Sequence, residues 1–461
     1  MLAQVTPIWS HPSVTRMAEG GDPLEAITSK AREMVLGAVQ AGWEGPPFDP
    51  FRLAEILGIV AVPKEDVLDA RIVSGGQRPE IQYNPNRPRT RVRFSLAHEI
   101  AHTLFPDYHQ SIRNRGSVAR SDDWELELLC NLAASELLMP TGYAVNPDTP
   151  PSVDMLIELQ ETCAVSLEAA AIRVAHSTRY PCNVAVASKR DPGGEGQSYR
   201  VDYSLASRTS PLQLDPGITL EGSVFSQCTA VGFTAKGREP SRSGARSLYW
   251  ECVGIPPYPG RSYPRVLGIC KLPAGSRTEL GTELVEVRGD ALKPRGPGPK
   301  VVAQVVNDKT PNWGGGFSKA ARERFPAAQA DFRRWAAESR ANLSLGSTHV
   351  TAVGEDTHLA SMVAQHGYGA SDVPRIRYIA LRKCLGLLRD AAVRLNATVH
   401  MPRVGAGLAG GNWSVISELI DEQLVRRGVS VTVYSLPGRA APSPGDRPAK
   451  QSALSEEWSS G

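Results

Sequence analysis

One stretch of this sequence, RVRFSLAHEIAHTLF at residues 91–105, contains two histidines four positions apart. On an α-helix, residues with this spacing lie on one face, one turn above the other, so the imidazoles of His98 and His102 can bind a single tetrahedral Zn²⁺. Glu99 lies beside them, where its carboxylate can take a proton from a water molecule at the metal. Flanking apolar residues and Pro106 indicate a helix that ends before the proline.

A catalytic zinc usually has three protein ligands, so two histidines leave the site incomplete. A second helix is predicted at residues 122–139, DDWELELLCNLAASELLM, and it offers Glu125, Glu127 and Glu136. Glu127 and Glu136 are nine positions apart and therefore point to opposite sides of one helix. Only one of these two carboxylates can face the metal.

The HExxH segment, followed by Glu127-x-x-Cys130-Asn131 and by AASELLMP at residues 133–140, resembles the ImmA/IrrE-type metallopeptidases. The resemblance covers residues 25–180 and implies a mainly helical, zincin-like domain. It implies that His98, His102 and Glu127 hold Zn²⁺, that Glu99 is catalytic, and that Glu136 is structural. It also implies limited proteolysis of one regulatory protein, such as a repressor or an antitoxin. A site that binds metal but cleaves nothing is the alternative, and this ligand set also suits Mn²⁺ or Fe²⁺.

Length and composition indicate a protein of several domains with the composition of ordinary globular proteins. The 461 residues suggest about three domains, and the net charge of +3 is too small to favour direct nucleic-acid binding. The sequence has no apolar run of membrane-spanning length and no signal peptide, so we expect a cytoplasmic protein. Seven scattered cysteines predict neither a disulfide framework nor a zinc ribbon.

The pattern along the chain predicts α+β and α/β domains in series. Residues 1–24 are expected to be flexible, and residues 25–180 to form the metallopeptidase domain, with short strands that include 70–73 and 80–83. An exposed edge strand there can hold an extended peptide. The other segments expected are a β-rich middle domain at 181–280 of unassigned function, a three-layer α/β/α domain at 281–437 and a disordered tail at 438–461.

Two glycine-rich turns follow strands in the third of these domains. The first runs from Asn307 through WGGGF at residues 313–317, and the second, RVGAGLAGGNW at residues 403–413, leads into a helix. Glycines at a strand-to-helix turn allow backbone N–H groups to approach a phosphate closely, and the helix N-terminus favours the anion. Two such turns in one βαβ domain predict a phosphate-containing ligand.

Together with Gly289-Asp290, these turns resemble the macrodomain family of ADP-ribose binders, over residues 283–437. The resemblance implies that Asp290 binds the adenine amine, that Tyr434 lies near the base, and that residues 307–316 and 405–411 surround the distal ribose and the diphosphate. The implied ADP-ribose-binding residues are Asp290, Asn307, Gly314, Gly315, Gly316, Gly405, Ala406, Gly407, Leu408, Ala409, Gly410 and Tyr434.

Related glycohydrolases use a lysine and an aspartate where this chain has Gln365 and Ala409, which argues against their mechanism here. Gln365, His366 or Asp308 can still orient a water molecule, so hydrolysis of an ADP-ribose derivative stays open. We therefore expect a zinc peptidase whose macrodomain binds ADP-ribose or an ADP-ribosylated partner. The alternatives are an ADP-ribose-binding module on a catalytically silent protease scaffold and an ADP-ribosyl hydrolase.

Overall fold

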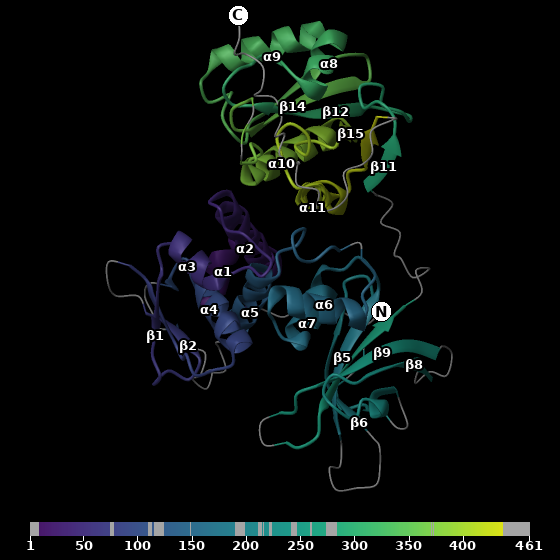
Figure 1. Ribbon diagram of the computed structural model, residues 1–461. Helices are drawn as coiled ribbons and strands as arrows, with labels where there is room; N and C mark the ends of the chain where they lie inside the picture. Colours follow the sequence, from purple (N-terminus) through teal and green to yellow (C-terminus); the bar gives the residue numbers. More distant parts are fainter. Residues whose placement is uncertain are drawn as a thin grey trace, which may run out of the picture. The chain divides into compact units, whose positions relative to one another are not determined.

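The computed structural model describes residues 9–73, 78–108, 113–114, 124–147, 149–189, 199–210, 214, 216–220, 224–240, 247–258, 261–272, 284–369, 371 and 373–436. The chain divides into two compact units, residues 1–278 and residues 279–461, and each is described by itself. Helices and three sheets confirm the predicted α+β and α/β fold class (Figure 1). The expected tail at residues 438–461 lies outside the described residues.

Helices dominate the first part of unit one. Their starts have local causes: Asp22, Asp49 and Ser166 each accept a hydrogen bond from a backbone N–H of the first turn, and proline occupies the first turn of three helices. The helices are α1 (Pro12–Ala18), α2 (Pro23–Gln40), α3 (Pro50–Ile56), α4 (Arg89–His102), α5 (Trp124–Leu138), α6 (Val153–Cys163) and α7 (Leu167–Ser177).

From residue 9 onward, the N-terminal segment differs from the flexible stretch expected at residues 1–24; residues 1–8 lie outside the described residues. Val14 and Met17 of α1 are buried in a core that includes residues of α2, α4 and α5. The Glu125 carboxylate, at the start of α5, accepts hydrogen bonds from Ser10 N–H and Oγ and from His11 N–H. These contacts join residues more than a hundred positions apart, which periodicity in a short window does not reveal.

A small sheet lies beside α4, with strand order β1-β3-β2-β4. The strand pair predicted at residues 70–73 and 80–83 is confirmed as the antiparallel strands β2 and β3. The other edge of β2 pairs with β4, so β2 is not an open edge strand. The bounds are β1 (Val60–Pro63), β2 (Ala70–Val73), β3 (Glu80–Tyr83) and β4 (Arg113–Asn114).

A six-stranded antiparallel sheet, β7-β6-β5-β10-β9-β8, follows α7. The boundary expected near residue 180 does not separate two cores, because Val184 and Leu267 of this sheet share one apolar core with Leu156 and Val174 of α6 and α7. The alternation of polar and apolar residues along these strands predicts a sheet, but it does not reveal which elements cover each face. The elements are β5 (Cys182–Lys189), β6 (Tyr199–Ala206), β7 (Thr219–Leu220), η2 (Val224–Gln227), β8 (Thr234–Pro240), β9 (Ser247–Ile255) and β10 (Arg265–Lys271).

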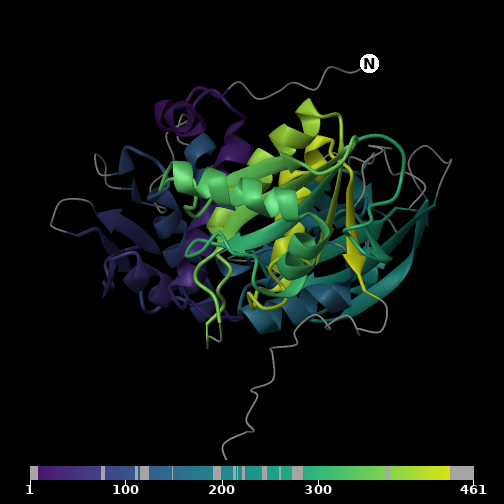
Figure 2. The same ribbon diagram turned by 90° about the horizontal axis from the view of Figure 1, so that it is seen from above.

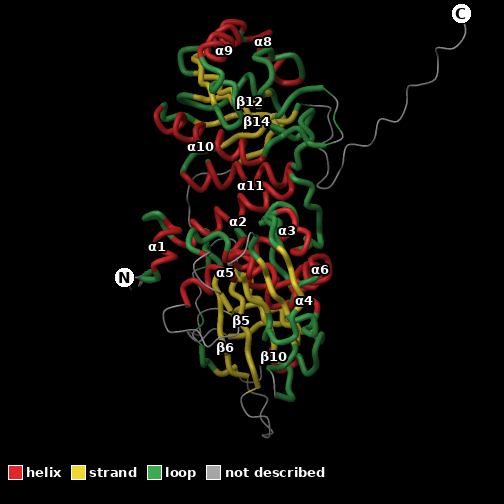
Figure 3. Tube along the Cα trace, turned by 90° about the vertical axis from the view of Figure 1, so that its left-hand side faces the viewer, coloured by secondary structure: helices red, strands yellow, loops and turns green. Residues whose placement is uncertain are grey.

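Unit two is a three-layer α/β/α structure. Its sheet has the order β11-β16-β15-β12-β14-β13, and every neighbouring pair is parallel except β13 with β14. Helices α8 and α9 cover one face, nearest the viewer in Figure 2, and Figure 3 shows α10 and α11 on the other. The strands are β11 (Leu284–Arg288), β12 (Lys300–Asn307), β13 (Thr348–Ala352), β14 (Thr357–Gln365), β15 (Thr398–Pro402) and β16 (Val431–Ser435).

The helices of this unit are α8 (Gly316–Arg324), α9 (Pro326–Glu338), α10 (Tyr378–Arg394) and α11 (Trp413–Gln423), with a short 3₁₀ turn η4 at Val425–Arg427. Sequence analysis did not identify α9, although Pro326 at its first turn is a typical start signal. Among the described residues of both units, no helix combines the length and apolar character that crossing a bilayer requires.

Candidate functional site

Helices α4 and α5 bring the three predicted metal ligands together. The rings of His98 and His102 are fully buried, with centroids 5.0 Å apart. The carboxylate of Glu127 faces both rings: its Oε2 is 3.1 Å from His98 Nε2, and its Oε1 is 3.8 Å from His102 Nε2. The Glu127 side chain is 28% exposed, so this side of the pair is accessible from solvent while the histidines are not.

The Nδ1 atoms of His98 and His102 are contacted by two further residues of α5, which lie one helical turn after Glu127. Asn131 Oδ1 lies 3.0 Å from His98 Nδ1, and Cys130 Sγ lies 3.3 Å from His102 Nδ1. An amide oxygen can only accept, so His98 Nδ1 carries the proton and Nε2 keeps its lone pair. Such contacts fix the tautomer and ring orientation of histidines that bind metals. The sequence motif contained both residues but did not reveal this role.

The donor set fits zinc. Two neutral imidazoles and one carboxylate form a ligand set found in catalytic zinc sites, and His98 Nε2 is buried with no hydrogen-bond partner among the described residues. His98, His102 and Cys130 also have ligand atoms within 4.8 Å of one another. Cys130, however, contacts the Nδ1 side of His102, whereas both Nε2 atoms face Glu127. The geometry therefore favours Glu127 over Cys130 as the third ligand.

Glu99 is completely buried next to the histidines. Its Oε2 accepts a hydrogen bond from Ile72 N–H of β2 at 2.9 Å, so the small sheet fixes the orientation of this carboxylate. A carboxylate adjacent in sequence to a metal-binding imidazole, and held by a backbone donor, is suited to accept a proton from a nucleophile near the metal.

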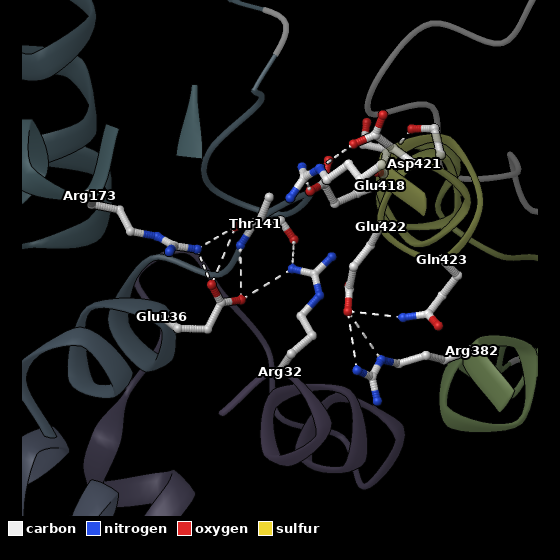
Figure 4. A network of polar contacts seen from close by, with 12 residues as sticks. Arg32, Glu136, Thr141, Arg173, Arg382, Glu418, Asp421, Glu422 and Gln423 are labelled. Atoms are coloured by element: carbon white, nitrogen blue, oxygen red, sulfur yellow. Dashed lines mark hydrogen bonds and ion pairs between the residues drawn. The ribbon is translucent and has the colours of Figure 1, made fainter. Parts of the chain in front are cut away.

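Glu136 lies on the other side of α5, as the nine-residue spacing predicted. It is buried, and Figure 4 shows its carboxylate between the guanidinium groups of Arg32 from α2 and Arg173 from α7. Thr141 N–H and Oγ1 donate to the same carboxylate. Glu136 therefore connects three helical segments and takes no part in the metal site.

In unit two, the predicted ligand residues and the residues predicted to orient a water lie at or near the carboxyl ends of five parallel strands, which are all at one edge of the sheet. The predicted ligand residues are Asp290 after β11, Tyr434 in β16, residues 403–411 after β15 and residues 307–316 at the end of β12; Gln365 and His366 lie at the end of β14. With strands spaced about 4.8 Å apart, this row spans roughly 19 Å. Ligands of open α/β sheets bind at this edge, so the row suits an elongated molecule.

The second glycine-rich turn is built as a cradle of backbone N–H groups. Gly405 and Gly410 have φ angles of +73° and +68°, which favour glycine. A Cβ at Gly411 would lie 2.8 Å from the Gly405 carbonyl oxygen. Within the described residues, the N–H groups of residues 407–409 donate no hydrogen bond to protein. Free N–H groups in such a turn can bind an anion.

Side chains predicted to contact the ligand also stabilise their own turns. Asp290 Oδ1 accepts from Leu292 N–H, and Asn307 Oδ1 accepts from the N–H groups of Lys309 and Thr310. Tyr434 is 5% exposed, and its hydroxyl accepts from Arg295 N–H and lies 3.0 Å from His400 Nδ1. Tyr434 therefore supports the floor of the turn next to Gly289 and presents little surface to a ligand.

The two glycine-rich turns approach each other at Leu408, which is 80% exposed: a Cβ added at Gly315 or Gly316 would lie 3.5 or 3.4 Å from Leu408 Cδ1. A group that sequence analysis missed holds the base of the second turn. Glu286 of β11 accepts hydrogen bonds from Arg403 Nη2 at 2.7 Å and Trp413 Nε1 at 3.0 Å. The alternation of β11 places Glu286 in a strand but gives no sign of these partners.

Comparison with known proteins gives a family match within unit one. Residues 54–175 match the model of the family described as IrrE N-terminal-like domain. The chain is 30% identical over 212 residues to the radiation response metalloprotease IrrE of Deinococcus deserti, with 43% of this chain and 73% of that protein aligned.

Other matches concern a shorter part of the chain. It is 30% identical over 165 residues to the chromodomain-helicase-DNA-binding protein 1-like of Mus musculus, but spans only 18% of that relative's length. A solved macrodomain protein from Streptomyces coelicolor is 41% identical, with 33% of this chain and 99% of that chain covered and a TM-score of 0.30. Because that TM-score is low, the fold of unit two is assigned from its own sheet order and glycine-rich turns. The chain belongs to the IrrE family of metalloproteases, and its second unit is a macrodomain.

Proposed function

We propose that unit one is a zinc-dependent endopeptidase. The observation that carries this proposal is the Glu127 carboxylate facing both His98 Nε2 and His102 Nε2 from a separate helix. His98, His102 and Glu127 would hold the ion. A bound zinc supplies a Lewis acid that polarises a peptide carbonyl and makes water more acidic.

The protein's own residues supply the rest of the chemistry. Glu99 accepts a proton from the attacking water, and its bond to Ile72 N–H keeps the carboxylate in place while the charge changes. The same carboxyl group then returns that proton to the leaving amine. Asn131 and Cys130 keep the imidazole rings oriented through the Nδ1 atoms. The substrate would be one regulatory protein, such as a repressor or an antitoxin-like regulator, as the family resemblance implies.

Glu99→Gln tests this proposal because it removes the proton acceptor but keeps an oxygen for Ile72 N–H. We expect the purified variant to contain about as much zinc as the wild type. Incubated with a cell extract, the wild type should generate new protein N-termini, measured by mass spectrometry after N-terminal labelling, and the variant should not. Equal cleavage by both proteins would refute the peptidase proposal. Normal zinc content without cleavage by either protein would favour the silent scaffold.

We propose further that unit two binds ADP-ribose or an ADP-ribosylated macromolecule. The row of predicted residues at the carboxyl ends of five parallel strands carries this proposal, together with the unused N–H groups of residues 407–409. The adenine end would lie near Asp290, the diphosphate at residues 405–411 and the distal ribose at residues 307–316. The two sites make this chain a peptidase with an ADP-ribose-responsive or partner-recruiting module.

Calorimetry with ADP-ribose tests the binding proposal. Asp290→Asn keeps an acceptor for Leu292 N–H but removes the carboxylate charge, so the turn should survive. Loss of a hydrogen bond to a charged group costs about 1.5–3 kcal/mol, so we expect roughly 10- to 100-fold weaker binding. Wild-type protein that releases no heat with ADP-ribose, and is not stabilised by it, would refute the proposal.

A further inference from the structure

An exposed apolar surface adjoins the open side of the proposed metal site in unit one. Trp124 and Leu128 of α5 are 47% and 45% exposed, and they lie one helical turn apart. Single exposed apolar residues are common, but neighbouring ones beside a functional opening indicate a binding surface. Glu127 lies at that opening, since its side chain is 28% exposed while both histidines are buried. The position of the apolar pair therefore relates it to the substrate.

The N-terminal segment extends this surface. The ring of Trp9 stacks on that of Trp124, with centroids 6.0 Å apart and planes at 23°. The backbone next to Trp9 is fixed to the start of α5, because Ser10 N–H donates to the Glu125 carboxylate at 2.9 Å. We call the side chains of Trp9, Trp124 and Leu128 the apolar shelf. Trp9 precedes residues 54–175, which match the family model, so this part of the shelf is not a feature of that model.

The shelf begins within one helical turn of the accessible metal ligand. Successive residues of a helix are rotated by about 100°, so Trp124 lies roughly 60° and Leu128 roughly 100° around α5 from Glu127. The Cβ atoms of residues three apart are about 5–6 Å from each other, and an extended peptide advances about 3.4 Å per residue. A substrate with its carbonyl at the metal can therefore lay the side chain of an adjacent residue on the shelf.

The size of the shelf suits one side chain of a substrate better than a second folded chain. A large aromatic side chain has at most about 250 Å² to bury, and Trp124 and Leu128 are each only half exposed. A stable interface between proteins buries about 800 Å² per partner, which is well beyond what these side chains offer. The shelf alone is thus too small for a dimer contact, but it matches a single large residue.

The chemistry of the shelf favours an apolar occupant. Its three residues are uncharged, so an ionised substrate side chain would lose water there without gaining an opposite charge. Glu127, the neighbouring carboxylate on α5, is directed at the two histidines. Burial of a large apolar side chain, in contrast, strengthens binding roughly 10- to 100-fold.

We propose that the apolar shelf binds a large aliphatic or aromatic side chain of the substrate, at one of the two residues that flank the scissile bond. This inference rests on the proposed peptidase function of unit one. Trp9, Trp124 and Leu128 are then specificity-determining residues, because they contact the substrate beside the reacting bond and take no part in proton transfer. The substrate is a protein with such a residue in an accessible, extended segment.

The first test reads the preference from the wild type. The full chain with zinc is incubated with a cell extract, and labelled new N-termini identify the cleaved bonds. We expect a large apolar residue at one of the two flanking positions in most of them. A synthetic peptide from the most frequent site should be cleaved, and replacing its large apolar residue by alanine should lower kcat/KM roughly 10- to 100-fold. Replacement by lysine should lower kcat/KM at least as much.

The second test removes the shelf. Trp124→Ala should cleave the parent and alanine peptides with nearly equal kcat/KM, because the surface that distinguishes them is gone, while its zinc content should match the wild type. A purely structural role would lower both rates and leave their ratio unchanged. Leu128→Asp should reduce the ratio in the same way. Phe233→Ala is the matched control: Phe233 is 57% exposed and lies just before β8 in the six-stranded sheet, so the full ratio should remain.

The outcomes separate this inference from the peptidase proposal. Cleavage at bonds without a large apolar neighbour, or faster cleavage of the lysine peptide, would overturn the inference and leave the peptidase intact. Both results come from the wild type and hold even if a variant fails to fold. An unchanged ratio in a folded Trp124→Ala protein would also overturn it. Absence of cleavage by the wild type, or equal cleavage by Glu99→Gln, would refute the peptidase and the inference together.

Discussion

Two of the three glutamates of α5, Glu127 and Glu136, permit a sharp test, because they lie on one helix yet their substitution should affect different properties. Glu127→Gln removes the carboxylate that faces both histidine Nε2 atoms, and its side chain is partly exposed. Glu136→Gln removes a buried charge from between Arg32 and Arg173. We expect the first change to reduce zinc binding with little effect on the metal-free fold, and the second to weaken the fold itself.

The magnitude for Glu127 follows from mass action. Loss of groups that merely orient a metal ligand costs 10- to 100-fold in affinity, so loss of a direct ligand should cost at least about 100-fold. At zinc 100 times the wild-type Kd, binding stabilises the wild type by about 2.7 kcal/mol and the variant by about 0.4 kcal/mol. For a unit of this size those values correspond to Tm increases of roughly 5–10 °C and about 1 °C. Differential scanning fluorimetry with and without zinc measures both.

The magnitude for Glu136 follows from its burial. Removing one partner of a buried ion pair costs about 3–5 kcal/mol, because the two guanidinium groups remain buried without the carboxylate. The metal-free Tm should therefore fall by roughly 6–20 °C, while zinc should still stabilise whatever remains folded. Unchanged zinc stabilisation in Glu127→Gln would refute the ligand assignment. Loss of zinc binding in Cys130→Ala, with binding retained in Glu127→Gln, would transfer that role to Cys130.

Three further predictions concern unit two. Burial lowers the pKa of His400 in the folded chain to about 4, below its ordinary value of 6.5. The unfolded chain therefore takes up a proton at His400 more readily than the folded chain does. Stability that is present at pH 7 is lost as the pH falls through about 6.5 toward 4. Between pH 7 and pH 5, urea denaturation should show the wild type losing about 2 kcal/mol more than His400→Gln, and equal losses would refute this. Gly405→Ala should cost about 1–2 kcal/mol because φ is +73°, whereas Gly407→Ala, with open space around it, should be nearly neutral in the same assay. Glu286→Gln should release Arg403 and weaken ADP-ribose binding roughly 10-fold by calorimetry, and unchanged affinity would show that this contact does not shape the turn.

What the sequence predicted well was local. The spacing of His98 and His102 fixes their common helix face whatever surrounds them, and the nine-residue spacing in α5 separates Glu127 from Glu136 in the same way. The glycine-rich turns were recognisable because particular backbone positions, such as Gly405, require φ angles that few other residues adopt. Each of these features is determined by residues that lie close together in the sequence.

What the sequence did not reveal depends on distant partners. Nothing within a short window indicates that Asp308 meets His366, 58 positions later, or that Glu125 binds Ser10 and His11. The shared core of the six-stranded sheet and the helices α6 and α7 is another case, because alternation does not say which element covers a strand. Each of these features depends on tertiary pairing, which the pattern of one segment does not encode.

The positions of the proposed metal ligands depend both on local spacing and on distant partners. Glu127 of α5 faces both imidazoles, Asn131 contacts that of His98, and Cys130 contacts that of His102. The position of α5 relative to α4 therefore determines whether the Nε2 atoms and the carboxylate converge. Glu125 connects the start of α5 to the N-terminal segment, and Glu136 connects its end to α2 and α7. A shift of about 1 Å along α5 is enough to impair a site of this kind. Ser10 and His11, which the sequence placed in a flexible segment, therefore help to hold the proposed metal ligands in register.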